Sequence, residues 1–376
     1  MPRTPDTEIP RLILAWYKKN RRDLPWRRTN DPYRIWISEI MLQQTRVETV
    51  IPYYASFLRR FPDVKALARG RLDSVLKAWE NLGYYSRARH LHEAARVVVN
   101  RFGGTIPETE ERLLELPGVG AYTAGAILSI AFGRPVAAVD GNVIRVISRL
   151  FGIRELVDRP DTRKKIEGIA QRLVPPEKPG HFIQALMDLG SGICTPRSPD
   201  CPTCPVAGLC VAHRKGFQES VPAKKKAYVI PQRREAAVII RNSTGEVLMI
   251  KRPQRGLLGG LWRFPGCAIE RREQPATKLR SCLRDGLGLR VAPGKEIFRI
   301  EHGYSHFSVE VQVFEGRIRE GLTGNNGALP WRWVDPDKRP GPALSGLERK
   351  ILRRWQTHRR DQNRFADGKS PTKGVK

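Results

Sequence analysis

DPYRIWISEIMLQQTRV, residues 31–47, predicts a buried helix that carries a charge in its middle. Asp31 can cap the free amides of a helix start, and Pro32 suits the first turn because its missing N–H costs nothing there. We therefore expect a helix from Pro32 to about Val47. Its apolar residues spread over most of the circumference, which is typical of a helix buried on all sides. They are Ile35, Trp36, Ile37, Ile40, Met41 and Leu42.

Three polar residues interrupt this apolar surface. Glu39, Gln43 and Arg46 are spaced i, i+4 and i+7, so on a continuous helix they would share one narrow stripe. The stripe either touches solvent, in which case it says nothing of function, or lines a pocket inside the protein. Taken alone, Glu39 fits both interpretations equally well.

Length and charge limit the class of protein. The 376 residues are enough for two domains, and 40% hydrophobic residues are enough for a core in each. A formal net charge of +29, from 67 basic and 38 acidic residues, favours nucleic acid as the partner. We find neither an apolar run of about 18 residues nor a signal peptide. We expect a soluble monomer without a membrane partner, inside the cell, cytoplasmic and nucleoid-associated if bacterial.

The pattern of the sequence changes beyond its middle. Up to about residue 213, apolar residues of helical period alternate with short Gly/Pro turns. The basic stretch that follows contains two prolines and no helical period, which is typical of a linker. Strands are then expected at 235–242, 246–252, 306–316 and 331–334. We predict an all-α domain at 1–213, a linker at 214–234, an α+β domain at 235–356 and a disordered basic tail at 357–376.

Four of the six cysteines cluster as C-x6-C-x2-C-x5-C. They are Cys194, Cys201, Cys204 and Cys210. A reducing compartment argues against disulfides, and thiolates this close together, between prolines, suit a compact tetrahedral S4 site. A structural zinc site is the alternative, although the spacing differs from the paired C-x2-C units of zinc ribbons. The other two, Cys267 and Cys282, are expected to be buried small apolar residues.

LPGVGAYTAG, residues 116–125, places a glycine-rich turn directly before an apolar helix. Gly118, Val119 and Gly120 would present backbone N–H groups and a helix N-terminus, which bind phosphate without reading bases. This is the helix-hairpin-helix pattern of DNA binders that ignore sequence. Such turns also join helices that bind nothing.

LGYYSRARHLHEAA, residues 82–95, combines aromatic and basic residues. Tyr84 or Tyr85 could wedge into a base stack while Arg87 and Arg89 contact phosphates. Core aromatics beside solvated arginines are an equally good interpretation.

Asp140 lies in AVDGNVIRVISRL, residues 138–150, directly before another expected helix. By itself it favours a helix cap over a functional role. A pair with Glu39 would change that interpretation. A buried acid with a raised pKa can protonate a leaving group, while an ionised aspartate stabilises a developing oxocarbenium ion.

Taken in order, SEIMLQQT, LGYY-x-RAR, LPGVG-x-YTAGAI, VDGNV, MDLG and the four-cysteine spacing resemble the MutY family of adenine DNA glycosylases in the endonuclease III superfamily. The resemblance covers nearly the whole chain. It implies a multidomain fold: an all-α helix-hairpin-helix glycosylase domain with one 4Fe–4S cluster on the four cysteines, then an α+β Nudix-like domain. The implied partner is double-stranded DNA with adenine opposite 8-oxoguanine or guanine. The adenine is flipped out and hydrolysed from its sugar.

The resemblance also implies roles for single residues. Glu39 would protonate adenine at N7, Asp140 would stabilise the cationic sugar, and Asn142 would orient the site. Because Tyr122 stands beside them where bifunctional relatives carry a Schiff-base lysine, we expect a monofunctional enzyme. Further residues on segments that contact the adenine or the DNA are Arg22, Trp26, Arg27, Gln43, Gln44, Thr45, Leu82, Tyr84, Arg87, Gly118, Val119, Gly120, Ser305 and His306.

The Nudix-like domain departs from the pattern of a working hydrolase. SCLRDGLGL, residues 281–289, keeps only Asp285 of the acidic cluster that would hold magnesium. We therefore expect recognition of the oxidised guanine instead of nucleotide hydrolysis. HGYSHF, residues 302–307, matches the family's Phe-Ser-His loop with Tyr304 in place of Phe, so a more polar wedge is expected. Loop residues beside the cysteines, such as Arg197 and Arg214, are expected near phosphate.

Two other functions stay open on the sequence alone. The same fold could act on a thymine or uracil mismatch or on an oxidised pyrimidine, although relatives of that kind usually lack Glu39 and the second domain. A DNA-binding or redox-sensing iron–sulfur protein without catalysis would need neither carboxylate.

Overall fold

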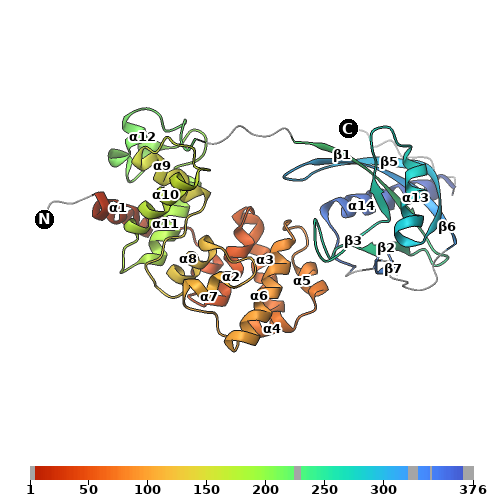
Figure 1. Ribbon diagram of the computed structural model, residues 1–376, viewed down its shortest axis with the longest axis horizontal. Helices are drawn as coiled ribbons and strands as arrows, with labels where there is room; N and C mark the ends of the chain where they lie inside the picture. The colour runs from red at the N-terminus through yellow and green to blue at the C-terminus, as the bar shows by residue number, and fades with distance from the viewer. Residues whose placement is uncertain (1–4, 224–229, 321–328, 339–340, 367–376) are drawn as a thin grey trace. The chain divides into compact units, whose positions relative to one another are not determined.

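The structure, a computed structural model, describes residues 5–223, 230–320, 329–338 and 341–366. The chain folds into two compact units. The helical unit comprises Met1–Gly70 and Arg89–Ala227, and the sheet unit comprises Arg71–Ala88 and Tyr228–Lys376 (Figure 1). Residues 71–88 thus belong with the C-terminal part, which differs from the continuous domain at 1–213 expected from the sequence.

Helices make up the helical unit. They are α1 (Pro5–Asn20), η1 (Pro25–Arg27), α2 (Pro32–Leu42), α3 (Val47–Arg60), α4 (Val64–Arg69), α6 (Ser86–Phe102, which begins in the sheet unit), α7 (Glu110–Leu114), α8 (Ala121–Ile130), α9 (Gly141–Phe151), α10 (Pro160–Leu173), α11 (Pro179–Gly192), η2 (Cys201–Thr203), η3 (Ala207–Leu209) and α12 (Val211–Arg214). The described part of this unit contains no strand beyond an isolated bridge between Leu156 and Ala223, so the all-α prediction is confirmed. No helix in the described part of the chain is sufficiently long and apolar to traverse a membrane.

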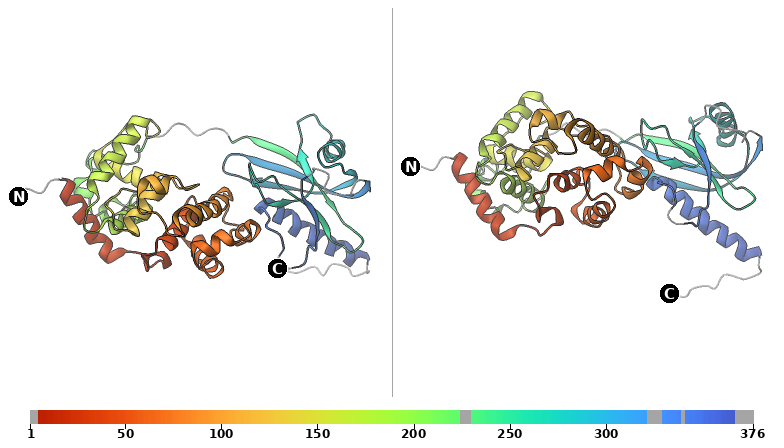
Figure 2. Two further views of the ribbon diagram at one scale, coloured as in Figure 1. Left: turned by 60° about the horizontal axis from the view of Figure 1, so that its bottom comes forward. Right: turned by 90° about the horizontal axis from the view of Figure 1, so that it is seen from below.

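One hydrophobic core joins α1, α8, α9, α10 and α11, which pack side by side (Figure 2). Its centre consists of fully buried side chains from four of these helices: Ile13, Ile147, Ile166, Phe182 and Leu186. This packing fixes the N-terminus of α9 against α11, next to the cavity that contains the candidate active site.

The helix predicted at residues 32–47 ends earlier than expected. Asp31 caps it as predicted, accepting hydrogen bonds from the Tyr33 and Arg34 amides at 2.8 and 3.3 Å. However, α2 stops at Leu42, and Gln44 adopts a left-handed conformation with φ 55° that cannot continue an α-helix. Residues 43–46 are all polar, so no buried apolar side chain stabilises a further turn.

The sheet unit is an α+β fold, as predicted. Its elements are α5 (Leu72–Ala78), β1 (Gln232–Ile240), β2 (Val247–Lys251), β3 (Trp262–Arg263), β4 (Gly266–Ala268), α13 (Pro275–Leu287), β5 (Arg290–Gly303), β6 (Ser308–Glu320), β7 (Trp331–Val334) and α14 (Gly346–Ala366). One sheet has the order β4-β1-β6-β5, with β1 and β6 parallel, and the other has the order β3-β2-β7.

Both faces of the larger sheet are covered, which explains the continuous apolar run in β1. Ala237 and Ile239 face the core that contains Ile351 and Trp355 of α14. The alternate residues of β1 face the second core, which contains Leu279 and Leu283 of α13. Thus α13 and α14 lie on opposite sides of the sheet (Figure 1).

Two boundary predictions need correction. Residues 357–366 of the predicted disordered tail continue α14, because the preceding turns are anchored through Trp355, whose Nε1 donates to Glu315 at 2.7 Å. Residues 367–376 lie outside the described residues. In the predicted linker, Val221 accepts a hydrogen bond from Arg149, so residues up to Ala223 pack on the helical unit, and β1 already begins at Gln232. Residues 224–229 lie outside the described residues.

Candidate active site

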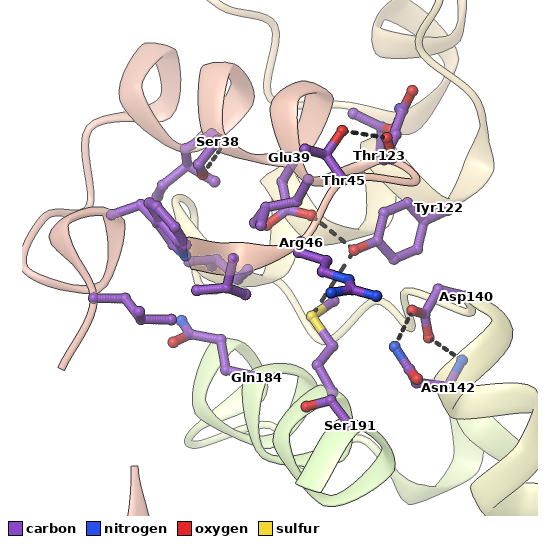
Figure 3. A pocket seen from close by; sticks show the side chains of 18 of the residues that line it. Ser38, Glu39, Thr45, Arg46, Tyr122, Thr123, Asp140, Asn142, Gln184 and Ser191 are labelled. Atoms are coloured by element: carbon purple, nitrogen blue, oxygen red, sulfur yellow. Dashed lines mark hydrogen bonds between the residues drawn. The ribbon is translucent and has the colours of Figure 1, made fainter. Parts of the chain in front are cut away.

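A cavity of about 800 Å³ lies within the helical unit, among α2, the turn at 43–46, the N-termini of α8 and α9, and α11 (Figure 3). It brings together eleven of the residues singled out from the sequence. They are Arg22, Trp26, Arg27, Glu39, Gln43, Gln44, Thr45, Gly120, Tyr122, Asp140 and Asn142. Arg46 lines the cavity as well, so the polar residues of the opening stretch face a pocket.

Glu39 is a buried acid. Its side chain belongs to a residue that is only 4% exposed, and its Oε2 accepts a hydrogen bond of 2.8 Å from the Tyr122 hydroxyl. Burial raises the pKa of Glu39 to about 7, and the charge of Asp140 adds to this, while the Tyr122 hydrogen bond and Arg27 lower it. The carboxyl group therefore holds a proton near neutral pH and can donate it.

Asp140 caps α9 and lines the cavity at the same time. Its Oδ1 accepts hydrogen bonds from the amides of Asn142 and Val143 at 2.9 and 2.8 Å, and its Oδ2 accepts one from Asn142 Nδ2 at 2.8 Å. The capping interpretation is thus correct, but it does not exclude a functional one. Three donors fix the carboxylate at the positive end of the α9 dipole (Figure 3).

Arg145 holds Asn142 in place. Its guanidinium donates to Asn142 Oδ1 at 2.7 Å and to the carbonyl oxygens of Gly190 and Cys194, both at 2.6 Å. The residue is 8% exposed. Arg145 was not among the residues predicted from the sequence, although an arginine amid the apolar run of α9 is a signal of a buried polar contact. The amide of Asn142 is consequently oriented by α11 and by the first cysteine segment.

Asp188 of α11, 4% exposed, pairs with both predicted arginines of the N-terminal segment. Arg22 donates to Oδ1 at 2.6 and 2.9 Å, and Arg27 donates to Oδ2 at 2.7 Å and to Oδ1 at 2.9 Å. Asp188 lies in MDLG, a motif to which the sequence alone assigned no role. Beside this group, Trp26 is buried, with its ring edge-on to Tyr54 at 5.5 Å, and gives the cavity a planar apolar wall.

Polar side chains of residues 43–46 line the cavity from the turn after α2, and not from a continued helix. Gln43 Nε2 donates to Thr123 Oγ1 at 3.3 Å, and the Thr45 hydroxyl donates to the Gln43 carbonyl at 3.3 Å. Gln44 lies between them with its left-handed backbone. The prediction that Glu39, Gln43 and Arg46 share one helix face is therefore wrong, while their convergence on one cavity is right.

The helix-hairpin-helix turn lies between α7 and α8. Gly118 has φ 78°, and a Cβ atom on it would come within 2.7 Å of His90 Cβ, so glycine is required there. Gly120 is the N-cap of α8 and supplies no side-chain cap. Val119 departs from the expectation, because its amide already donates to the Leu116 carbonyl and its side chain is buried.

The four clustered cysteines lie near one another, and the buried Arg149 lies beside two of them. Burial raises the pKa of Cys201, and the neighbouring Cys210 and Cys194 raise it further. Arg149 Nη1 donates to Cys194 Sγ at 3.3 Å, and Cys210 Sγ donates to the Arg149 carbonyl at 3.4 Å. The four cysteine sulfurs match the donor set of a 4Fe–4S cluster, and the nearby guanidinium would offset the negative charge of their thiolate forms. Within the described residues, no group of His, Cys, Asp or Glu side chains is arranged around a single metal ion.

The remaining predicted residues lie in the sheet unit, outside this cavity. Ser305 and His306 are exposed at the tip of the hairpin between β5 and β6, where the Tyr304 amide donates to the Phe307 carbonyl at 2.8 Å. Tyr304 packs against Phe307, with ring centroids 4.7 Å apart, and burial raises its pKa to about 12. Tyr304 is thus half-buried against Phe307, and the more polar wedge expected there stays a prediction.

The residues of the aromatic and basic segment divide into two groups. Tyr84 is 38% exposed, and its hydroxyl shares a hydrogen bond of 2.5 Å with Ser305 Oγ. Leu82 and Arg87 are 5% and 8% exposed, so neither presents its side chain to solvent. The expected direct contact of Arg87 with phosphate does not fit this burial.

Comparisons with known proteins agree with this geometry. Residues 37–176 match the family described as HhH-GPD superfamily base excision DNA repair protein, residues 194–210 match the iron-sulfur binding domain of endonuclease III, and residues 236–354 match the NUDIX domain.

Among curated proteins, the chain is 36% identical to adenine DNA glycosylase of Rattus norvegicus, over 94% of this chain and 79% of that protein. It is 36% identical to adenine DNA glycosylase of Homo sapiens, over 92% of this chain and 73% of that protein. Among solved structures, a thermostable thymine-DNA glycosylase matches with a TM-score of 0.52 and 36% identity, over 56% of this chain and 97% of that one. The chain therefore belongs to the adenine DNA glycosylase family, base excision repair enzymes whose cysteine loop carries a 4Fe–4S cluster and whose second domain is NUDIX-like.

Proposed function

We propose that this enzyme removes adenine mispaired with 8-oxoguanine or guanine in double-stranded DNA, after the adenine is flipped into the cavity at Glu39. The observation that carries the proposal is a buried carboxyl group with a pKa of about 7 in the same cavity as a fixed aspartate. A volume of about 800 Å³ is within the usual range for small-molecule sites and leaves room for a nucleoside.

The two carboxyl groups divide the chemistry of hydrolysis. Glu39 donates its proton to a ring nitrogen of adenine, N7 by the family resemblance, so that the base can leave with the electron pair of the glycosidic bond. Asp140 stabilises the positive charge that develops on the sugar. A water molecule then attacks the sugar carbon, and the ionised Glu39 can take up the released proton.

The surrounding residues hold the base and the distorted duplex. Trp26, Arg22 and Arg27 line the cavity where the adenine ring would lie, and Asp188 holds both arginines in place. Flipping costs a few kcal/mol, which Gln44 and Tyr84 would offset by filling the space around the orphaned partner. Thr45 would assist through its hydrogen bond to Gln43.

The hairpin and the overall charge supply affinity without sequence preference. Gly118 and Gly120 shape the turn before α8, whose N-terminus would bind a phosphate. The net charge of +29 attracts the duplex over a longer range.

The same geometry supports a monofunctional enzyme. Tyr122 hydrogen-bonds to Glu39 and offers no amine for a Schiff base. Glycosidic hydrolysis alone leaves an abasic site, so the DNA strand would stay intact until alkali or heat is applied.

We assign recognition of the opposite base to the sheet unit, through Ser305 and His306 at the hairpin tip. Nucleotide hydrolysis is not proposed, because Asp285 on α13 is exposed and paired with the adjacent Arg284 at 2.8 Å. We further propose that the enzyme acts as a monomer inside the cell, where its substrate is.

Removal of thymine is the second candidate, because a thymine-DNA glycosylase is similar to 56% of this chain at 36% identity. The two candidates differ in the leaving group. Adenine offers a ring nitrogen that a neutral Glu39 can protonate, and the pKa of about 7 fits that need.

A panel of duplexes tests the proposal. Adenine is placed opposite 8-oxoguanine, G, C or T, with a G:T duplex added, and each is incubated with enzyme and then with or without alkali. We expect strand breaks only after alkali and only for adenine opposite 8-oxoguanine or G. Excision of thymine from G:T would support the second candidate, and breaks without alkali would contradict a monofunctional enzyme. Glu39→Gln should bind the duplex without excising the base.

A further inference from the structure

A strained loop of the sheet unit, residues 81–84, ends in an exposed aromatic ring. Asn81, Gly83 and Tyr84 have φ values of 81°, 72° and 46°. Such left-handed conformations are costly for residues other than glycine and persist only where the surroundings fix them. Tyr84 is also 38% exposed, so burial of its own ring does not explain the conformation.

Arg87 fixes this loop from the inside. Its Nη2 donates to the carbonyl oxygens of Leu82 and Gly83, both at 3.2 Å. Its guanidinium lies over two rings, 5.5 Å from the centroid of Trp79 and 5.4 Å from that of Tyr84. A guanidinium can donate hydrogen bonds in its plane while its faces contact aromatic rings. The ammonium group of a lysine is not planar and cannot do both at once.

Trp79 also holds the loop at residues 81–84, since its Nε1 donates to the Gly83 carbonyl at 3.2 Å. The Gly83 oxygen thus accepts from two side chains. The backbone that carries Tyr84 is therefore held by Arg87 and Trp79 together, without help from DNA.

We propose that Arg87 is a positioning residue that presets Tyr84 for insertion into the duplex and makes no phosphate contact of its own. The inference rests on the proposed function in so far as Tyr84 enters DNA. It differs from the assignment that a basic residue beside an aromatic one invites, because Arg87 is only 8% exposed and burial lowers its pKa to about 10.

The loop also reaches the hairpin tip that we assign to the opposite base. The Tyr84 hydroxyl and Ser305 Oγ are 2.5 Å apart. Displacing the loop would therefore disturb both the inserting ring and Ser305. Arg87 should accordingly influence discrimination between 8-oxoguanine and guanine without touching either.

The test compares Arg87→Lys, Arg87→Met, Tyr84→Ala and the double variant Arg87→Met/Tyr84→Ala with the wild type. Arg96→Met is the control, because Arg96 is exposed on α6 and its loss removes the same charge. Single-turnover excision is measured on adenine opposite 8-oxoguanine. Ring insertion is followed by the fluorescence of 2-aminopurine placed beside the opposite base, and duplex affinity is measured over a range of salt concentrations, both in a Glu39→Gln background.

We expect Arg87→Met and Arg87→Lys to slow excision by about tenfold, the effect of losing about one hydrogen bond from a charged donor. Both variants should reduce the change in 2-aminopurine fluorescence that reports ring insertion. Arg96→Met should behave like the wild type in excision rate and in fluorescence. The double variant should be no slower than Tyr84→Ala, because Arg87 acts through Tyr84. The salt dependence of affinity should not change for either Arg87 variant.

Three results would overturn the proposal. They are wild-type excision by Arg87→Lys, a rate loss in the double variant equal to the product of the two single losses, and a salt dependence of duplex affinity whose slope falls by about one in an Arg87 variant, as expected for a lost phosphate contact. Thermal midpoints show which variants are folded, and Arg87→Lys provides the test if Arg87→Met does not fold. If the wild type excised no adenine, the proposed function would fail, but fluorescence and salt dependence would still decide the role of Arg87.

Discussion

Replacing Glu39 with glutamine should stabilise the helical unit at alkaline pH while abolishing excision. The carboxyl group is buried, and burial raises its pKa from 4.5 to about 7. The folded protein therefore binds a proton that the unfolded chain releases between these two pH values. In that window the free energy of unfolding falls as pH rises, and above pH 7 the full cost is present.

The size of this cost follows from the two pKa values. Their difference corresponds to about 3 kcal/mol at pH 8 and to nothing below pH 4.5. Glutamine is nearly isosteric, carries no charge and can still accept the Tyr122 hydrogen bond through its amide oxygen. A gain of about 2–3 kcal/mol corresponds to a rise of about 5–10 °C in the unfolding midpoint for a unit of this size.

Thermal unfolding of wild type and Glu39→Gln at one scan rate, from pH 5 to pH 8.5, measures this gain. Glu93→Gln is the control, because Glu93 is exposed on α6. The control should shift the midpoint little at any pH, and the advantage of Glu39→Gln should grow through neutrality. A Glu39→Gln protein no more stable than wild type at pH 8, or equally stabilised at pH 5, would refute the buried, neutral acid.

Tyr122→Phe should move the alkaline limb of the single-turnover excision rate to higher pH, because the lost hydrogen bond is one of the two influences that lower the Glu39 pKa; a limb unchanged or moved to lower pH would contradict this. Gly190→Ala should slow excision by about tenfold or more, since the new Cβ would lie 2.6 Å from Asn142 Cβ and strain of this kind costs about 1–3 kcal/mol. Gly192→Ala on the same helix, with no atom within 4 Å, is its control. Removing the iron–sulfur cluster should abolish absorbance at about 400 nm and lower the thermal midpoint, because the cysteine loop loses its internal link.

The catalytic carboxylates show where inference from sequence was limited. Periodicity placed Glu39 on a polar stripe but left its burial undecided, because the residues that cover it come from α8 and α11, far along the chain. Asp140 was more readily explained as a helix cap, and it is one. Its second role depends on where α9 begins relative to α2, which local sequence does not specify.

The end of α2 could not be predicted for a different reason. The stretch QQTR contains neither glycine nor proline, so nothing in it indicates a left-handed residue at Gln44. The strand β5 was missed on similar grounds, since it contains Pro293 and Gly294, is irregular in its pairing with β6 and alternates poorly between buried and exposed residues.

Two missed residues were predictable in principle. Arg145 and Asp188 each interrupt a run of apolar residues, as Glu39 does, and the argument that selected Glu39 applies to them without change. All three are buried and hydrogen-bonded to groups that line or brace the cavity. A charge within an apolar run is therefore a better guide here than the type of residue.

Asp188 also explains how Glu39 stays protonated close to a cation. Arg27 lines the same cavity and would favour the ionised form of Glu39, yet it is only the last of the influences on that pKa. Both of its terminal nitrogens are bound to Asp188 at 2.7 and 2.9 Å, so its charge is directed to another carboxylate. Because Asp188 forms an ion pair with Arg27, the Arg27 guanidinium can contact a bound base while Glu39 keeps the proton that it must donate. The shape of the pocket and the pKa of its acid thus depend on the same buried ion pair.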